Sequence, residues 1–187
     1  MLITIEKAKE LVRKYLKDRN NQIHSRESEV VLRAVAQELG ENEETWAMAG
    51  LLHDLDWELT SDNFKEHGIK TITLLQNEGC EVSEEIKQAI ASHNEKYTAV
   101  KCQAKLDYAL SAGESITGLI YAYALMRPEK LAGMKANSLN KKLKDKSFAQ
   151  NVSRELIADI EKAGLEKSKF FEIAIQAMQS IAPEIGF

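Results

Sequence analysis

The chain has 187 residues, of which 44% are hydrophobic and 29% are charged, the proportions of an ordinary globular domain. Its 25 lysines and arginines against 29 aspartates and glutamates give a net charge of −4, which argues against a surface for duplex nucleic acid. Two cysteines are too few for a disulfide framework, and no apolar run reaches the roughly 18 residues of a membrane span. We therefore expect a cytoplasmic domain with no signal peptide and no membrane partner.

The chain has only two prolines and no strand-like alternation of useful length, which predicts an all-helical fold. Apolar residues at helical spacing predict a first helix, which Asn20 and Asn21 end. The same spacing predicts a helix that begins at Ser83 and ends near His93. The expected ranges of the other helices are 23–39, 43–52, 62–78, 103–126, 151–163 and 168–181, and that of the first helix is 4–18.

We expect one domain over residues 1–187, with a core of 20–127 and a helical C-terminal extension of 128–187. Six lysines lie between Lys130 and Lys146. Such a run is most often a solvated loop, but it can also form an electropositive rim that holds a phosphate. In that second interpretation Lys141 and Lys142 bind the phosphate, and Arg154 contributes a fork-shaped donor to it.

The four histidines are the most informative residues of the chain. All of them, His24, His53, His67 and His93, fall in or beside predicted helices, and Asp54 directly follows His53 at the end of an apolar run. Imidazole and carboxylate together suit a borderline-to-hard cation such as Fe, Mn, Zn or Mg. This distribution is what a metal site built from several helices leaves in a sequence.

Glu114 adds a carboxylate to this set. It lies at the edge of the apolar stripe of the longest predicted helix, next to Gly113 and near Gly118, which we expect to leave room for it. A carboxylate in such a place is costly to bury unless it is paired or bound to a metal. The alternatives are a buried ion pair and a position on the rim.

With these residues in order, the chain resembles the HD-domain superfamily of metal-dependent phosphohydrolases. The ordered histidines and the His53-Asp54 pair carry the resemblance. The runs Gly50 to Glu58, Thr117 to Ile120 and Lys141 to Ala149 look most similar to a small bacterial and archaeal branch of uncharacterised members. Similar members have an aspartate where this chain has Glu114. Asp107, nearly two turns earlier on the same helix, is the alternative ligand.

The resemblance implies an all-helical HD-type bundle that holds its metal site between helices. It implies one or two divalent transition metal ions, Fe, Mn, Zn or Ni, with Mg as a further option. The first ion is expected among His24, His53, Asp54 and Glu114, and the second between His67 and His93, with Asp54 as a bridge. Asp54 and Asp56 are then the catalytic residues, and Asp56 acts either as a general base or as support for a ligand. The alternative for Asp56 is an acid on the surface.

The function that follows is hydrolysis of a phosphomonoester or phosphodiester by metal-activated water. The expected partner is a small phosphorylated substrate, either a nucleotide or another metabolite. Two other functions stay open: a two-iron enzyme that uses oxygen, and a non-catalytic signalling or binding module in which Glu114 marks a decayed site. Composition and spacing leave the substrate and the oligomeric state open.

Overall fold

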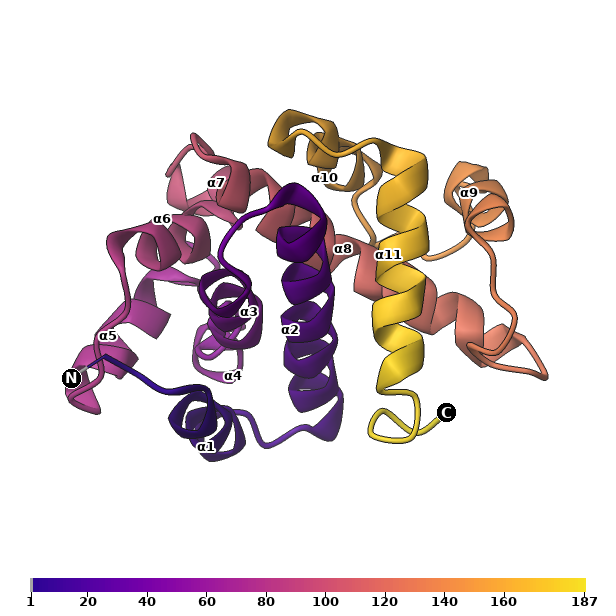
Figure 1. The fold of residues 1–187 in the computed structure, drawn as a ribbon. Helices are drawn as coiled ribbons and strands as arrows, with labels where there is room; N and C mark the ends of the chain where they lie inside the picture. Colours follow the sequence, from indigo (N-terminus) through magenta and orange to yellow (C-terminus); the bar gives the residue numbers. More distant parts are fainter. Residues whose placement is uncertain (1) are drawn as a thin grey trace.

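The computed structural model describes residues 2–187, which fold into helices and contain no β-strand, as the sequence predicts (Figure 1). One isolated bridge joins Leu2 and Glu81. No helix in this described part is both long enough and apolar enough to cross a bilayer. The helices are α1 Ile5–Tyr15, α2 Arg19–Leu39, α3 Glu43–Leu52, α4 Trp57–Thr60, α5 Ile69–Asn77, α6 Glu84–Ser92, α7 Glu95–Thr98, α8 Lys105–Met126, α9 Ala136–Lys144, α10 Arg154–Ala158, the 3-10 helix η1 Asp159–Ala163 and α11 Lys167–Ser180.

The long helices α2 and α8 form the centre of the molecule. α2 packs against α3 on one side and against α11 on the other, while α8 crosses behind it (Figure 1). Buried side chains from both halves of the chain, such as Leu32, Trp46, Leu110 and Phe170, belong to one continuous apolar core. The division into a core of 20–127 and an extension of 128–187 stays a prediction.

Two glycines let α2 pack closely against its neighbours. A Cβ atom at Gly50 of α3 would lie 2.5 Å from the backbone oxygen of Ser28 on α2, so the two backbones are in contact there. A Cβ atom at Gly113 of α8 would lie 2.3 Å from Cδ2 of Leu32. The expectation that Gly113 leaves room for Glu114 is therefore wrong, because the space beside Gly113 is filled by α2. Gly118 faces Val152 in ordinary contact.

The boundary between the first two helices differs from the prediction. Asn20 and Asn21 do not end a helix but lie in the first turn of α2. The side chain of Asp18 accepts a hydrogen bond from the backbone N–H of Asn20 at 2.8 Å and caps this turn. An N-cap satisfies an otherwise unpaired N–H group, so a polar run that reads as a break can begin a helix.

The helix predicted over 62–78 is wrong in its first half. Residues 61–68 form turns, and α5 begins only at Ile69. The cause is Gly68, which has a φ of +85° and lies so close to α6 that a Cβ atom would be 2.6 Å from the Ile90 oxygen. Only glycine adopts this conformation without strain. The short helices α4 and α7 were not predicted.

The lysine run is also not the solvated loop that its composition favours. Residues 136–144 form the helix α9, which buries Leu139 and Leu143 and places its lysines in the last turn. These two leucines are four residues apart and therefore lie on one helix face. The helix predicted over 151–163 is divided into α10 and η1.

We predict opposite effects on stability for alanine at two helical glycines. Gly50→Ala should lower the free energy of unfolding by about 1–3 kcal/mol, because the new methyl group meets the Ser28 backbone, which cannot yield. Gly118→Ala is the control and should raise it by up to about 1 kcal/mol, because it removes chain entropy without a clash. Urea unfolding measures both. Equal stabilities would contradict the close contact of α2 and α3.

Candidate metal centre

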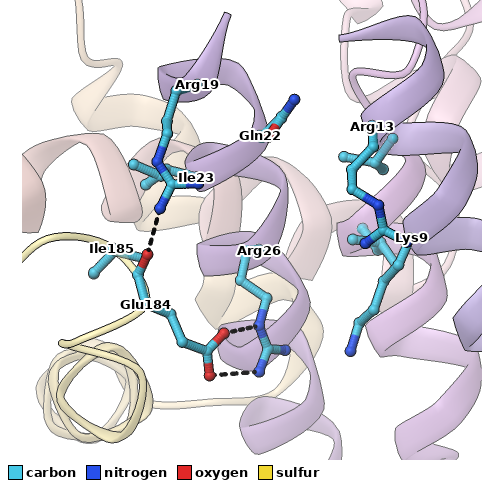
Figure 2. Close-up of a pocket in the computed structure, with 10 residues that line it drawn as sticks. Lys9, Arg13, Arg19, Gln22, Ile23, Arg26, Glu184 and Ile185 are labelled. Atoms are coloured by element: carbon cyan, nitrogen blue, oxygen red, sulfur yellow. Dashed lines mark hydrogen bonds and ion pairs between the residues drawn. The ribbon is translucent and has the colours of Figure 1, made fainter. Parts of the chain in front are cut away.

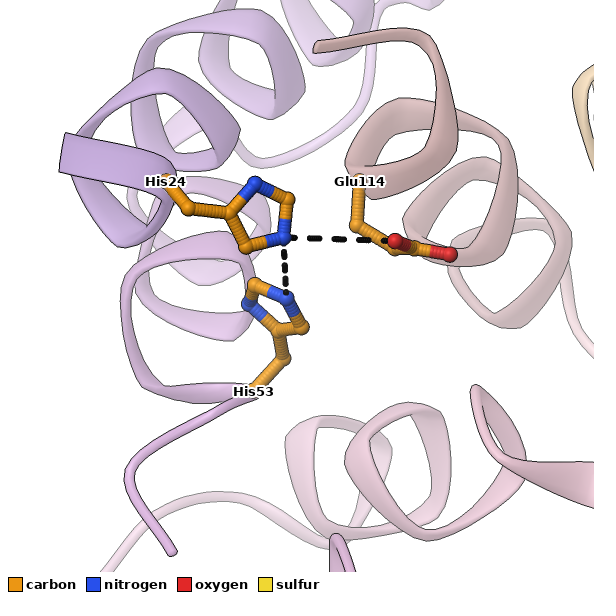
Figure 3. A group of neighbouring side chains, drawn as sticks. All are labelled: His24, His53 and Glu114. Carbon is orange, nitrogen blue, oxygen red and sulfur yellow. Dashed lines mark hydrogen bonds and ion pairs between the residues drawn. The ribbon is translucent and has the colours of Figure 1, made fainter. Parts of the chain in front are cut away.

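The four histidines come together where α2, α3, α6 and α8 meet. His24 lies on α2, His53 and His93 are the C-cap residues of α3 and α6, and His67 lies in the turn before α5. The Nε2 atoms of His24 and His53 are 3.3 Å apart, and those of His67 and His93 are 3.1 Å apart. Figure 3 shows His24 and His53 facing each other and Glu114 reaching toward them from α8.

His53 and His93 are oriented by the ends of their own helices. Nδ1 of His53 lies 2.8 Å from the Gly50 oxygen, and Nδ1 of His93 lies 2.6 Å from the Ile90 oxygen. A backbone oxygen can only accept, so each Nδ1 carries the proton and donates it. In a neutral imidazole Nε2 then keeps its lone pair, the arrangement found in histidines that bind metals.

His24 and His67 are oriented by side chains. The Thr117 hydroxyl donates its proton to the Glu114 backbone oxygen at 2.7 Å, so it accepts a hydrogen bond from Nδ1 of His24 at 3.2 Å. Nδ1 of His67 donates to Asp56 Oδ1 at 2.8 Å. All four histidines thus use Nδ1 for a protein acceptor and turn Nε2 toward one place.

Asp54 lies at the centre of this arrangement. Its Oδ1 is 3.4 Å from Nε2 of His53, 3.2 Å from Nε2 of His67 and 3.6 Å from Nε2 of His93. Its Oδ2 is 3.7 Å from Nε2 of His24. Asp54 is therefore within reach of every histidine, as a bridging carboxylate would be.

The ligand atoms form two groups, each with all its atoms within 4.8 Å of one another. One group is His24, His53 and Glu114, and the other is Asp54, His67 and His93. Glu114 Oε1 accepts a hydrogen bond from the Ser115 hydroxyl at 2.6 Å, while Oε2 lies 3.9 Å from Nε2 of His24. Imidazole and carboxylate donors in two such groups fit one or two divalent cations.

Burial and mutual charge set the protonation of these groups. Burial lowers the pKa of His53 to about 3, which keeps its imidazole neutral, and raises the pKa of the Glu114 carboxyl. Burial opposes ionisation of Asp54 as well, but the surrounding histidines, His53 first, hold its pKa well below the usual range. Burial lowers the pKa of His67, but its hydrogen bonds to Asp54 and Asp56 outweigh this and raise it to about 9.

Asp56 is fully buried and lies behind His67. Its Oδ2 accepts the backbone N–H groups of Gly68 and Thr71 at 2.8 and 2.9 Å, while Oδ1 accepts from His67. All three donors fix the orientation of the carboxylate. Of the two roles expected for Asp56, this geometry favours support of a ligand over contact with a substrate.

Asp107, the alternative ligand, lies apart from both groups. Its Oδ2 accepts the backbone N–H groups of Gln103 and Ala104 at 2.8 and 3.1 Å, so it caps the start of α8. Thr117, three residues after Glu114, orients His24 and was not among the predicted site residues. Its signal was a hydroxyl one turn beyond the acid on the same helix face.

A hollow of about 470 Å³ opens onto the ligand groups. Aromatic rings and amides make up much of its wall, and no lysine or arginine lines it. The lining residues are Asn21, His24, Asp54, Trp57, Phe64, His67, His93, Asn94, Tyr97, Glu114, Asn151 and Leu156.

The residues expected to bind phosphate do not line this hollow. Arg154 donates to the backbone oxygens of five residues, and the five N–H groups of a guanidinium allow no more than this. These acceptors are Leu143, Asp145, Phe148, Ala149 and Val152. Lys142 lies over the rings of Phe148 and Tyr123, at 5.1 and 5.7 Å from their centroids, and Lys141 is exposed. Arg154 thus holds together the segment that brings Asn151 to the hollow.

Another hollow, of about 410 Å³, lies between α1 and α2, and Glu184 and Ile185 of the C-terminal turn also line it (Figure 2). Lys9, Arg13, Arg19 and Arg26 line it, and Glu184 is paired with Arg26 at 2.9 Å. Its lining includes no histidine and only one carboxylate, so it lacks the donors of a metal centre.

These observations define an all-helical protein with a cluster of histidines and carboxylates between its helices that could hold metal ions. The family model of the HD domain matches residues 21–143, which is 143 − 21 + 1 = 123 of the 187 residues. The chain belongs to the HD-domain family, a family of metal-dependent phosphohydrolases, as the resemblance predicted. No curated protein and no solved structure matches it.

We predict that Arg154 matters for stability and not through its charge alone. Arg154→Lys keeps the charge but loses the planar fork, and should lower the free energy of unfolding by about 1–3 kcal/mol because several partly buried carbonyls lose their donors. Lys141→Gln, on an exposed side chain, is the control and should change it by less than about 0.5 kcal/mol. Thermal unfolding without substrate checks this. If the stability of the Arg154→Lys protein is unchanged, the prediction is wrong and a phosphate-binding role for Arg154 is open again.

Metal binding should strengthen as the pH rises. His67 holds a proton up to a pKa of about 9, and a cation that binds its Nε2 must displace that proton. Affinity for Mn²⁺ should therefore rise up to roughly tenfold per pH unit between pH 6 and 9 and then level off. Calorimetry in two buffers that differ in protonation enthalpy counts the released protons. Affinity that is flat over this range would contradict it.

Proposed function

We propose that this protein is a metal-dependent phosphohydrolase that cleaves a phosphoester of a small nucleotide or another phosphorylated metabolite. The observation that carries the proposal is the shared orientation of the four histidines. Each has Nδ1 fixed by a protein acceptor and presents Nε2 to the space shared with Asp54 and Glu114. This arrangement is typical of metal-binding histidines, because most of the rings are buried, each Nδ1 is held by the fold, and each Nε2 faces a carboxylate or another imidazole of the same cluster.

The chain's own residues would divide the work as follows. His24, His53 and Glu114 hold one cation, and His67, His93 and Asp54 hold a second. A bound divalent cation lowers the pKa of a water toward roughly 7 and neutralises charge on the phosphoryl oxygens. Asp54 lies within reach of both groups and is the residue whose loss should matter most. Asp56 keeps His67 oriented.

The composition of the hollow supports a strict dependence on metal. No lysine or arginine lines it, and Asp54 and Glu114 bring negative charge to its floor. A phosphate would be repelled there unless cations offset these carboxylates. Substrate binding, and not only turnover, is therefore expected to require metal.

Glu114 provides the sharpest test of the proposal. Glu114→Gln keeps the shape and removes the charge, and should lower both metal affinity and phosphate release by at least about tenfold. Glu114→Asp should retain both, since the ligand atom type is unchanged. Asp107→Asn is the control and should leave metal content unchanged, because Asp107 caps α8. Metal analysis by mass spectrometry and phosphate release from a panel of phosphoesters give the two measurements.

The outcomes separate the competing functions. Phosphate release that is independent of oxygen supports a hydrolase, whereas oxygen consumption by the iron-loaded protein supports the two-iron enzyme. Asp54→Ala should abolish release while circular dichroism keeps its helical signal. Metal loss from Asp107→Asn together with a silent Glu114→Gln would reassign the last ligand. Protein that binds no metal would refute the proposal.

A further inference from the structure

One side of the hollow is an aromatic wall formed by Trp57, Phe64 and Tyr97. The ring centroids of Trp57 and Phe64 are 5.7 Å apart, and those of Phe64 and Tyr97 are 5.4 Å apart. Trp57 also meets the ring of the ligand His67 edge to face at 5.1 Å. The wall therefore runs from the metal centre outward without a break.

This wall remains open to solvent. Phe64 is 38% exposed and Tyr97 is 45% exposed, although both are large aromatic residues. Contiguous exposed aromatic surface is costly to keep in water and commonly marks a binding site. Here the surface also lines the hollow that holds the metal ligands.

The wall is fixed in position by the same turns that carry those ligands. Trp57 follows Asp54 by three residues, Phe64 precedes His67 by three, and Tyr97 follows His93 by four. The Asn94 amide donates to the backbone oxygens of Phe64 and His67 at 2.7 and 3.4 Å and so joins two of these turns. The distance from metal centre to wall is therefore set by short, hydrogen-bonded segments.

We propose that Trp57, Phe64 and Tyr97 select a phosphomonoester whose organic part is a flat aromatic ring. The inference rests on the proposed function and adds the substrate class. A ring stacks on aromatic side chains by its face, whereas a saturated group of the same size gains only area. The lining among the described residues offers the organic part this wall and amides such as Asn21 and Asn151.

The test compares benzylphosphonate and cyclohexylmethylphosphonate on the Mn²⁺-loaded protein. The two ligands share their carbon skeleton and their charged group, and the ring is flat and aromatic in the first and saturated in the second. Trp57 reports binding through its fluorescence, since the other tryptophan, Trp46, is 1% exposed. We expect benzylphosphonate to bind about 2- to 12-fold more tightly, the range that corresponds to ~0.5–1.5 kcal/mol for an aromatic pair. Tyr97→Leu should reduce this preference at least by half, and the control Tyr123→Leu, outside the hollow, should keep it.

Turnover is measured separately with benzyl phosphate and cyclohexylmethyl phosphate, which release similar alcohols. A higher kcat/KM for benzyl phosphate, lost in Tyr97→Leu, supports the proposal. Equal binding of the two phosphonates, or binding of neither, overturns the ring preference, and phosphate release from both esters would then leave the hydrolase itself standing. Binding of benzylphosphonate without any phosphate release would support the wall and refute the hydrolase.

Discussion

The hydrogen bond at Nδ1 of each histidine is the interaction on which the whole site depends. A ring without it rotates and exchanges tautomers, and Nε2 then has no fixed direction. For His53 and His93 the acceptor is a carbonyl in the last turn of the preceding helix. The last carbonyls of an α-helix have no backbone N–H partner within the helix and are free to accept such a bond. The positions at which α3 and α6 end are therefore part of the site, and the sequence must terminate these helices at Leu52 and Ser92.

Much of the fold and of the ligand set could be predicted because it follows from periodicity. The stripes of α2, α3, α6 and α8 are long enough to identify, and the histidines stand out because there are only four. Gly68 shows where this reasoning fails. It reads as a helical position, but its positive φ follows from the approach of α6, which is distant in sequence. The prediction that Arg154 binds phosphate fails for a similar reason. Its carbonyl partners are brought together only by the folded conformation of the segment after α9.

The C-terminal extension has a part in the site that composition does not reveal. α11 packs on α2, and α10 and η1 pack on α8, the two central helices that carry His24 and Glu114. The segment held by Arg154 also supplies Asn151, and α10 supplies Leu156, to the hollow. The ligands of the metal centre thus come from the core, whereas part of the surface that a substrate meets comes from the extension. Changes in the extension can alter selectivity without touching a ligand.

The ligand groups come from five stretches of chain that span residues 24 to 114. This affects the stability of the protein and its resistance to degradation. A cation held there cross-links these stretches, and the unfolded chain offers no such site, so binding adds to the stability of the fold. A hundredfold excess of metal over its dissociation constant adds about 2.7 kcal/mol. Residues 61–66 are all exposed, and their contacts with the rest of the chain include the Asn94 hydrogen bond to the Phe64 oxygen and the ring contacts of Phe64. Without the cation, exposed segments beside the ligands, such as this turn, lose the cross-link and become more open to proteases, so the abundance of the protein would follow the metal supply.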